Sequence, residues 1–312
     1  MKPCLTVFFL LALPWLSLAQ ARKTEPTYEA VAYGTHPRQV LDFYQAKSEK
    51  PTPVLFFIHG GGWVAGERRV ADLDKYLEAG ISVFAISYRF IDDAIEARIQ
   101  PPVKAPLYDA ARALQFVRSK AKEWNLDKSR IGASGGSAGA CSSLWLAFHK
   151  DLAEGDSEDP IARESTRLWC AAVTGAQTTL DPKQMKEWTP NSRYGGHAFG
   201  FYPDPKDKKT RDTQFAKFLE ARPTLLPFIQ EFSPFEHVSA DDPRIYLIYA
   251  DPPDLGKPAK DPTHSANFGV KLKEKLDAVG VDCELVYPGA KKVNHPSMLA
   301  YLKEKLKATE KK

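Results

Sequence analysis

A serine between closely spaced glycines is the residue of this sequence best suited to chemistry. Residues 135–139 read GGSAG and lie between an apolar run and a helical segment. A serine on a sharp strand-to-helix turn adopts a strained conformation that exposes its hydroxyl, and flanking glycines avoid collisions with the neighbouring chain. The pattern also fits around Ser134, but that register would put Gly135 and Gly136 in the first helical turn, where glycine is unfavourable. We therefore predict Ser137 as a nucleophile, with Ser134 as the alternative.

A second glycine-rich turn is suited to stabilising the negative charge that a serine nucleophile generates. Residues 59–63 read HGGGW and directly follow another apolar run. The backbone N–H groups of Gly61 and Gly62 can point at the oxyanion, and the N–H of Ala138 joins them at the positive end of its helix. We expect His59 to orient this loop rather than to act as a base.

Apolar runs and helical periods alternate along the chain, and these elements must position the two turns. The runs are nearly continuous and rich in β-branched and aromatic residues, which is typical of strands buried on both faces of a parallel sheet. They cover residues 54–58, 83–87, 130–133, 168–174, 245–249 and 283–287, with a first strand expected near Val40. Segments with one apolar helical face lie at 107–124, 268–276 and 299–306. This order predicts an α/β fold with a mostly parallel central sheet and helices on both faces.

Residues 177–242 break this alternation after the sixth strand. They contain no convincing strand and many of the proline, glycine and aromatic residues. Because ligands of open α/β sheets bind at the carboxyl ends of the strands, an insertion there can line or cover a pocket; a surface excursion without a role is the alternative. Its aromatic side chains can stack on a sugar or an aromatic acid, or simply pack the insertion against its domain. These aromatic residues, in and beside the insertion, are Trp63, Trp188, Tyr194, Phe199, Phe201 and Tyr202.

Residues 1–21 have the pattern of a secretory signal peptide. A lysine precedes the apolar run 5–13, and small residues follow at Ala19 and Ala21, after either of which cleavage can occur. The run is short for a membrane span and a proline interrupts it, so a membrane anchor is the weaker interpretation. We expect a secreted or periplasmic protein without a stable membrane anchor, whose mature single domain covers residues 22–312.

Composition excludes several classes of protein. With 43% hydrophobic and 26% charged residues the chain can build a large core. Its 43 Lys and Arg are interleaved with 39 Asp and Glu, for a net charge of only +4, so no basic stripe indicates a nucleic-acid partner. Cys4 should leave with the leader. Cys141, Cys170 and Cys283 are an odd number in apolar segments, so we expect buried free thiols rather than a disulfide framework.

With both glycine turns in place, the sequence resembles the α/β-hydrolase family. Within it the chain is similar to carboxylesterases of the HGGGW type, among them acetyl-xylan or feruloyl esterase-like and hormone-sensitive-lipase-like enzymes. The resemblance covers nearly all of the mature chain and includes the motif 87–89 (SYR) and Asp109, which in such enzymes form a structural Arg–Asp ion pair. It also implies a catalytic triad in the order serine, acid, histidine. The acid and the base are therefore sought after Ser137.

The resemblance places the catalytic histidine in the loop after the last strand. That loop, residues 288–295, contains one histidine, His295, which becomes the predicted base. The loop is a few residues longer than the family's usual PGAGH form. His237 and His264 lie in other segments, and His36 and His149 look peripheral, so none of these four is predicted as the base.

The acid is expected in the segment after the strand 245–249, where three aspartates compete. Spacing to the strand favours Asp251 or Asp254, whereas spacing to the following helix favours Asp261, which stands in an Asp-Pro pair as in similar enzymes. We choose Asp261, with Asp254 as the second candidate. The structural alternative is that Asp261 caps the helix that starts near Ser265.

These residues predict a serine esterase that works through an acyl-enzyme and requires no cofactor or metal. The substrate would be a small-molecule or carbohydrate-linked ester, and the oligomeric state is left open. One alternative is a serine peptidase of the prolyl-oligopeptidase type, although only a short segment precedes the first predicted strand. The other is a catalytically silent binding protein with the same fold, which typically lacks a triad residue.

Overall fold

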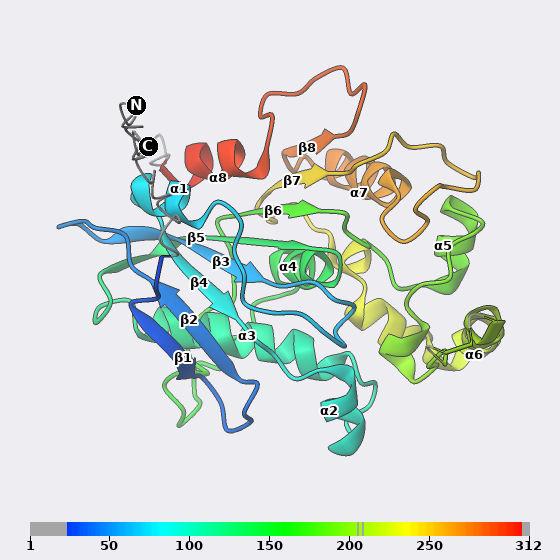
Figure 1. Cartoon of the computed structure of the whole chain (residues 1–312), viewed down its shortest axis with the longest axis horizontal. Coiled ribbons are helices and arrows are strands. Elements are labelled where there is room, and N and C mark those ends of the chain that lie inside the picture. The colour runs from blue at the N-terminus through cyan, green and yellow to red at the C-terminus, as the bar shows by residue number, and fades with distance from the viewer. Residues whose placement is uncertain (1–23, 205, 208, 308–312) are drawn as a thin grey trace, which may run out of the picture.

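An eight-stranded sheet forms the centre of the computed structural model, which describes residues 24–204, 206, 207 and 209–307 (Figure 1). Its strand order is β1-β2-β4-β3-β5-β6-β7-β8. The strands are β1 (Tyr28–Ala32), β2 (Val40–Tyr44), β3 (Thr52–Ile58), β4 (Ser82–Ile86), β5 (Leu126–Gly136), β6 (Cys170–Thr174), β7 (Arg244–Ile248) and β8 (Cys283–Val286). The pairs β1–β2 and β2–β4 are antiparallel, and every pair from β4 to β8 is parallel. The predicted α/β fold with a mostly parallel sheet is confirmed.

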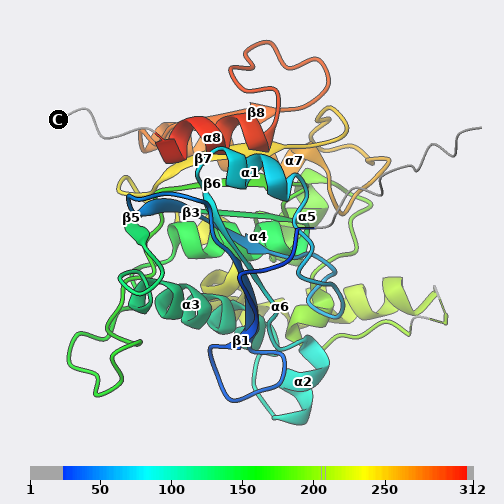
Figure 2. The same cartoon turned by 60° about the vertical axis from the view of Figure 1, so that its left-hand side comes forward.

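Helices cover both faces of this sheet, which explains why its central strands read as continuous apolar runs. Helices α1 (Leu73–Glu78) and α8 (Met298–Lys307) pack on one face, where Tyr76, Leu302 and Leu306 share a core cluster. The other face carries α3 (Lys104–Ser119), α4 (Ala138–Phe148) and α7 (Ala266–Ala278) over the larger core. Figure 2 shows α1 and α8 on the opposite side of the sheet from α3 and α4. All five residues of β4 are buried between these layers.

The segment between β6 and β7 is helical, as its lack of a strand pattern indicated. It contains α5 (Pro182–Trp188), the 3-10 turn η1 (Gly196–Phe199), α6 (Lys209–Phe232) and the 3-10 turn η2 (Pro234–His237). Figure 1 shows α5 and α6 beyond the tips of the central strands, at their carboxyl ends. Four of the aromatic side chains singled out above are buried, and Trp63 is completely so. Packing therefore accounts for these side chains without a ligand.

Several further expectations can be compared with the described residues. Arg89 and Asp109 form the predicted ion pair at 2.6 Å, with the carboxylate almost fully buried. Cys141, Cys170 and Cys283 are buried free thiols, as predicted. Among the described residues no helix is both long and apolar enough to cross a membrane. The predicted leader at 1–21, with its cysteine, lies outside the described residues.

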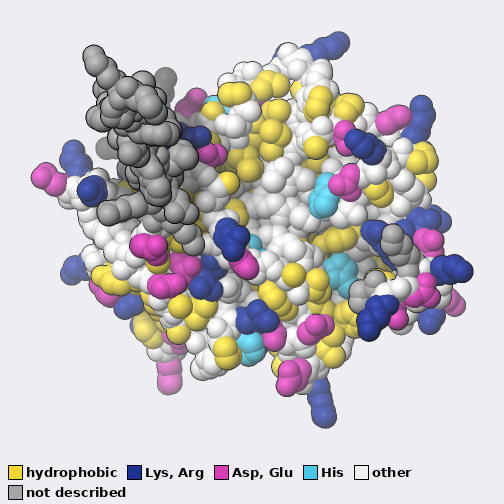
Figure 3. Space-filling view, in the orientation of Figure 1, with side chains coloured by type: hydrophobic (Ala, Val, Ile, Leu, Met, Phe, Trp, Pro, Cys, Tyr) yellow, Lys and Arg dark blue, Asp and Glu magenta, His cyan; other side chains and the backbone are white. Residues whose placement is uncertain are grey.

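Charged side chains of both signs are interspersed over the face in Figure 3, and neither sign forms a continuous stripe there. A nucleic-acid-binding surface concentrates lysine and arginine on one face. The visible face therefore agrees with the small net charge of +4.

Candidate active site

Ser137 occupies a sharp turn between β5, which ends at Gly136, and α4, which begins at Ala138. Its φ of 54° and ψ of −121° lie outside the regions that L-residues favour, which is the strain expected of a nucleophile at such a turn. The chain passes very close to β3 here, because a Cβ on Gly139 would lie 2.1 Å from the carbonyl oxygen of Ile58. Ser134, the alternative nucleophile, is buried inside β5.

The HGGGW loop lies directly against this turn. A Cβ on Gly60 would come within 2.6 Å of the carbonyl oxygen of Gly136. Gly61 and Gly62 have φ values of +100° and +62°, which suit glycine. The indole N–H of Trp63 donates to Ser142 Oγ on α4 at 3.0 Å and so ties the loop to the helix that follows the serine. The loop and the amino end of α4 are thereby held beside the serine hydroxyl.

A buried histidine, His59, and a partly buried one, His197, support this loop. His59 stacks on Tyr88, and its Nδ1 lies 2.8 Å from the carbonyl oxygen of Gly60. His197 of η1 donates from Nε2 to the carbonyl oxygen of Gly62 at 2.9 Å. Burial lowers the pKa of His59, and it lowers the pKa of His197 to about 4. Both rings are therefore neutral near pH 7 and act as fixed supports, in agreement with the expected role of His59.

The histidine beside Ser137 is His264. The Ser137 hydroxyl donates to His264 Nε2 across 2.9 Å, and His264 Nδ1–H donates to Asp261 Oδ2 across 2.8 Å. A hydroxyl, an imidazole and a carboxylate are thus connected in a row, which is the arrangement by which a base can remove the hydroxyl proton while a carboxylate fixes its tautomer.

Asp261 shapes the loop and also orients the ring. Its Oδ1 accepts the backbone N–H groups of Thr263 at 3.1 Å and His264 at 3.2 Å, while Oδ2 faces the imidazole. Partial burial opposes ionisation of this carboxyl group, but the hydrogen bonds from His264 and the two backbone groups outweigh it and lower the pKa of Asp261. The charged form therefore persists at neutral pH.

The other acid candidates do not face an imidazole. The carboxylate of Asp254 lies 3.7 Å from Lys257 Nζ on an exposed part of the loop, and Asp251 is also exposed. Ser265, not Asp261, caps α7, since its side chain accepts the N–H of Asn267. The structure thus pairs Asp261 with His264, whereas the sequence suggested His295 as its partner.

Two residues after β6 hold the segment 261–264 against the sheet edge. Gln177 is fully buried, and its Nε2 donates to the carbonyl oxygen of Thr263 at 2.7 Å. Gly175, with φ +57°, lies under the ring: a Cβ there would be 3.3 Å from His264 Cβ. The position of His264 therefore depends on the end of the neighbouring strand.

The prediction that His295 approaches Ser137 is wrong for this structure. His295 Nδ1–H donates to Glu284 at 2.6 Å and its Nε2–H donates to Glu304 at 2.9 Å. Glu284 is the second residue of β8 and Glu304 lies in α8, whereas Ser137 follows the carboxyl end of β5. The long β8–α8 loop folds back along the last strand and carries its histidine away from the nucleophile.

The sequence analysis does not predict His264 as the base, because the family resemblance places that histidine in the loop after the last strand. One available signal was local: His264 is three residues after Asp261 and directly before the cap of α7. An acid and a histidine at that spacing on one turn can meet without help from another loop. The order serine, acid, histidine is kept, but the last two come from the same segment.

Comparison with known proteins agrees with this architecture. The BD-FAE family model matches residues 41–261, more than two thirds of the chain. Gut esterase 1 of Caenorhabditis briggsae is 33% identical over 150 residues, 43% of this chain and 27% of that protein. A probable isoprenylcysteine alpha-carbonyl methylesterase of Arabidopsis thaliana is 30% identical over 142 residues, 45% of this chain and 28% of that protein. The chain spans less than a third of the length of these two relatives.

Solved structures share the fold at lower identity. An acetyl ester-xyloside bifunctional hydrolase from Caldicellulosiruptor lactoaceticus superposes with a TM-score of 0.59 at 24% identity, covering 80% of this chain and 76% of that one. A truncated carbohydrate esterase from gut microbiota superposes with a TM-score of 0.62 at 20% identity, covering 89% and 95%. At these low identities the two superpositions establish the α/β-hydrolase fold alone.

Proposed function

Because this chain belongs to the BD-FAE family of α/β-hydrolase esterases, we propose that it hydrolyses carboxylic esters through Ser137, His264 and Asp261. The observation that carries the proposal is the contact of 2.9 Å between Ser137 Oγ and His264 Nε2. It joins a strained serine to a base whose other nitrogen is held by a carboxylate.

The reaction follows from the hydrogen bonds of these three residues. His264 Nε2 takes the hydroxyl proton while Ser137 Oγ forms a bond to the ester carbonyl carbon. The imidazolium then gives this proton to the leaving alcohol oxygen as the ester C–O bond breaks, which leaves an acyl-serine. A water molecule repeats the sequence and releases the acid. Throughout, the Asp261 carboxylate stabilises the imidazolium and keeps the proton of the neutral ring on Nδ1.

The oxyanion of the tetrahedral intermediate would be held by the backbone N–H groups of Gly61, Gly62 and Ala138. Two features support this part of the proposal: the positive φ of both glycines, and the close approach of their loop to the serine turn. Loss of one such donor costs about 3 to 4 kcal/mol in the transition state. Because Trp63 and the neutral His197 anchor the loop, the donors are positioned before the substrate binds.

For the substrate, we favour esters attached to carbohydrate. Two structural neighbours are described as an acetyl ester-xyloside hydrolase and a carbohydrate esterase, and the leader-like residues 1–21 suit an enzyme that meets polysaccharide outside the cytoplasm. Export would leave a mature amino terminus at Gln20 or Arg22, which terminal sequencing of the exported protein can test. An intact Met1 would contradict export but leave the esterase proposal unaffected.

The direct test is hydrolysis by the purified mature protein of p-nitrophenyl esters of increasing acyl length, acetylated xylan and methyl ferulate. Turnover of acetylated xylan well above that of long-chain esters is the expected result. An organophosphonate should label Ser137 stoichiometrically, as mapped by mass spectrometry, and Ser137→Ala should abolish labelling and turnover, while Ser134→Ala retains both. Absence of turnover and labelling throughout would instead favour a silent binding protein. Peptide cleavage without ester cleavage would favour the peptidase.

A further inference from the structure

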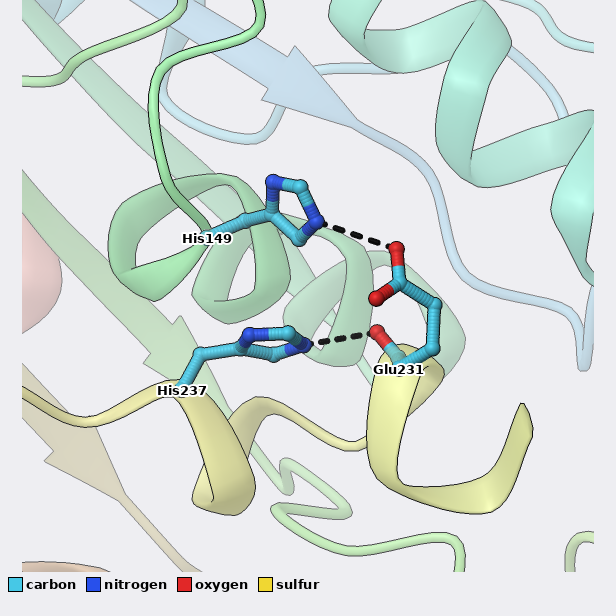
Figure 4. Close-up of side chains that lie close together, drawn as sticks. All are labelled: His149, Glu231 and His237. Carbon is cyan, nitrogen blue, oxygen red and sulfur yellow. Dashed lines mark hydrogen bonds and ion pairs between the residues drawn. The ribbon is translucent and has the colours of Figure 1, made fainter. Parts of the chain in front are cut away.

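Three potential metal ligands meet at the end of α4 that is remote from Ser137. His149 follows the last residue of α4, Glu231 is next to the last residue of α6, and His237 ends η2. One ligand atom from each of the three side chains lies within 4.8 Å of the others. Figure 4 shows both rings directed toward the glutamate from separate elements. Ester hydrolysis as proposed above uses none of them.

Both ring nitrogens of His149 face acceptor oxygens. Its Nδ1 lies 2.9 Å from the carbonyl oxygen of Lys150, and its Nε2 lies 3.1 Å from Glu231 Oε1. Both partners are acceptors, yet a neutral imidazole has only one N–H. With the proton on Nδ1, the lone pair of Nε2 faces a carboxylate oxygen. A cation between the two atoms would satisfy both, and an Nδ1–H donated to a backbone carbonyl is the usual support of a metal-binding histidine.

His237 directs its Nε2 at the backbone of Glu231 rather than at its carboxylate. This atom lies 2.7 Å from the carbonyl oxygen of Glu231 (Figure 4). That carbonyl also accepts the indole N–H of Trp145 at 2.8 Å, so it keeps a partner when Nε2 turns to a metal.

We infer that His149 Nε2, a carboxylate oxygen of Glu231 and His237 Nε2 bind a divalent transition metal ion of the Zn²⁺ class. Two imidazoles and one carboxylate are a donor set that Zn²⁺ accepts, with water as the fourth ligand. Tetrahedral bonds of about 2.0–2.1 Å bring ligand atoms to about 3.3 Å from one another. The Glu231 side chain is 38% exposed, so it is free to rotate inward and close this difference.

The space beside the cluster can hold the fourth ligand. A cavity of about 690 Å³ is lined by the three ligands and by Asp151, Arg167 and Asp241 among others. The positive charge of Arg167 is compensated because its guanidinium lies 3.0 Å from the carboxylate of Asp241. Lys150 also lines the cavity, so three carboxylates stand against two cationic side chains, and the net negative charge favours a cation in this space.

A metal here would tie the inserted helix α6 to the helix that carries the nucleophile turn. Glu231 lies at the carboxyl end of α6, and His149 directly follows α4. The ion would thus hold the end of α6 to the end of α4 that is remote from Ser137. Its role is structural, and this inference is independent of the esterase proposal.

The test uses the full mature chain without a histidine tag, freed of metal by dialysis against a chelator. Titration with Zn²⁺ against a chromophoric competitor should give one tight site per chain, and saturation should raise Tm by about 5 °C. Co²⁺ should give the intense visible bands of a tetrahedral site. Glu231→Gln and His237→Gln should each weaken Zn²⁺ binding at least about 100-fold and abolish these bands.

Glu236→Gln is the matched control, because Glu236 lies in η2 one residue before His237 but bonds to Gln184 instead. It should bind Zn²⁺ like the unsubstituted chain. Esterase turnover should stay within about twofold in all three variants when they are folded. Failure to bind Zn²⁺ at micromolar concentration, equal binding by all three variants, or an octahedral Co²⁺ spectrum would overturn the inference.

Discussion

Two loops of this molecule each place a histidine against a carboxylate, but only one of them also places it against a serine hydroxyl. After β7, His264 Nδ1 bonds Asp261 at 2.8 Å; after β8, His295 Nδ1 bonds Glu284 at 2.6 Å. The difference lies at Nε2. For His264 the partner there is the Ser137 hydroxyl, which donates a proton, whereas for His295 it is the carboxylate of Glu304, which only accepts one.

The two carboxylates around His295 favour the charged form of its ring. Burial disfavours a charged His295, but its hydrogen bonds to Glu284 and Glu304 outweigh burial and raise the pKa of His295. A ring whose protonated form is favoured by two carboxylates is a poor acceptor for the proton of a serine. A histidine–carboxylate pair by itself is therefore no sign of a catalytic base, and the partner on the second nitrogen decides its role.

The largest expected effect separates the two histidines directly. His264→Gln should reduce kcat by about four to six orders of magnitude, because Ser137 loses its proton acceptor. His295→Gln should change kcat by less than about threefold. Single-turnover and steady-state rates on a p-nitrophenyl ester measure both. If His295→Gln were the inactive variant, the β8–α8 loop would have to reach the active site in solution and the comparison would be reversed.

The next effect concerns the acid. Asp261→Asn should reduce kcat by about three to four orders of magnitude, because the amide favours the tautomer with the proton on Nε2, which cannot accept the serine proton. Its carbonyl oxygen can still accept the backbone N–H groups that Oδ1 holds now, so the loop should remain in place. Asp254→Asn is the control and should be nearly unchanged. Equal losses in both variants would point to loop disruption rather than to loss of the carboxylate.

A smaller effect tests how the neighbouring strand end positions His264. Gly175→Ala adds a Cβ at 3.3 Å from His264 Cβ and at positive φ, so kcat should fall about tenfold as the ring is displaced. Gly280→Ala has a similar backbone cost, since its φ is +80°, but its Cβ meets nothing within 4 Å. Both variants should lose about 1–2 kcal/mol of stability, and only Gly175→Ala should lose turnover. Parallel losses of kcat would refute the positioning role.

The smallest effect belongs to His295 and appears in stability. Because its folded pKa is raised, its contribution is complete below the unfolded pKa of about 6.5 and is lost as pH rises through the folded value. The Tm of the unsubstituted chain should therefore fall by about 2 °C more than that of His295→Gln as pH rises from 6 to 9. Scanning calorimetry of both proteins measures this difference. Identical pH profiles would show that His295 is not protonated between its two carboxylates.

Much of the fold could be predicted from local patterns. Continuous apolar runs such as 54–58 and 83–87 became central strands β3 and β4, and one-faced apolar segments became α3, α7 and α8. The strained turn at Ser137 was also predictable, since glycine is needed wherever a neighbouring strand approaches so closely. In each case the sequence pattern that predicts the feature lies within one short segment.

The sequence by itself located the proposed nucleophile turn and the glycine loop beside it, and it favoured Asp261 over Asp254 as the acid only with the help of a family resemblance. Only the tertiary structure decided which histidine lies between Ser137 and Asp261, because this depends on the paths of two loops. Gln177 and Gly175 hold His264 at the carboxyl edge of the sheet, while Glu284 draws His295 back along β8. These contacts join residues 11 to 89 positions apart, and no local spacing specifies them.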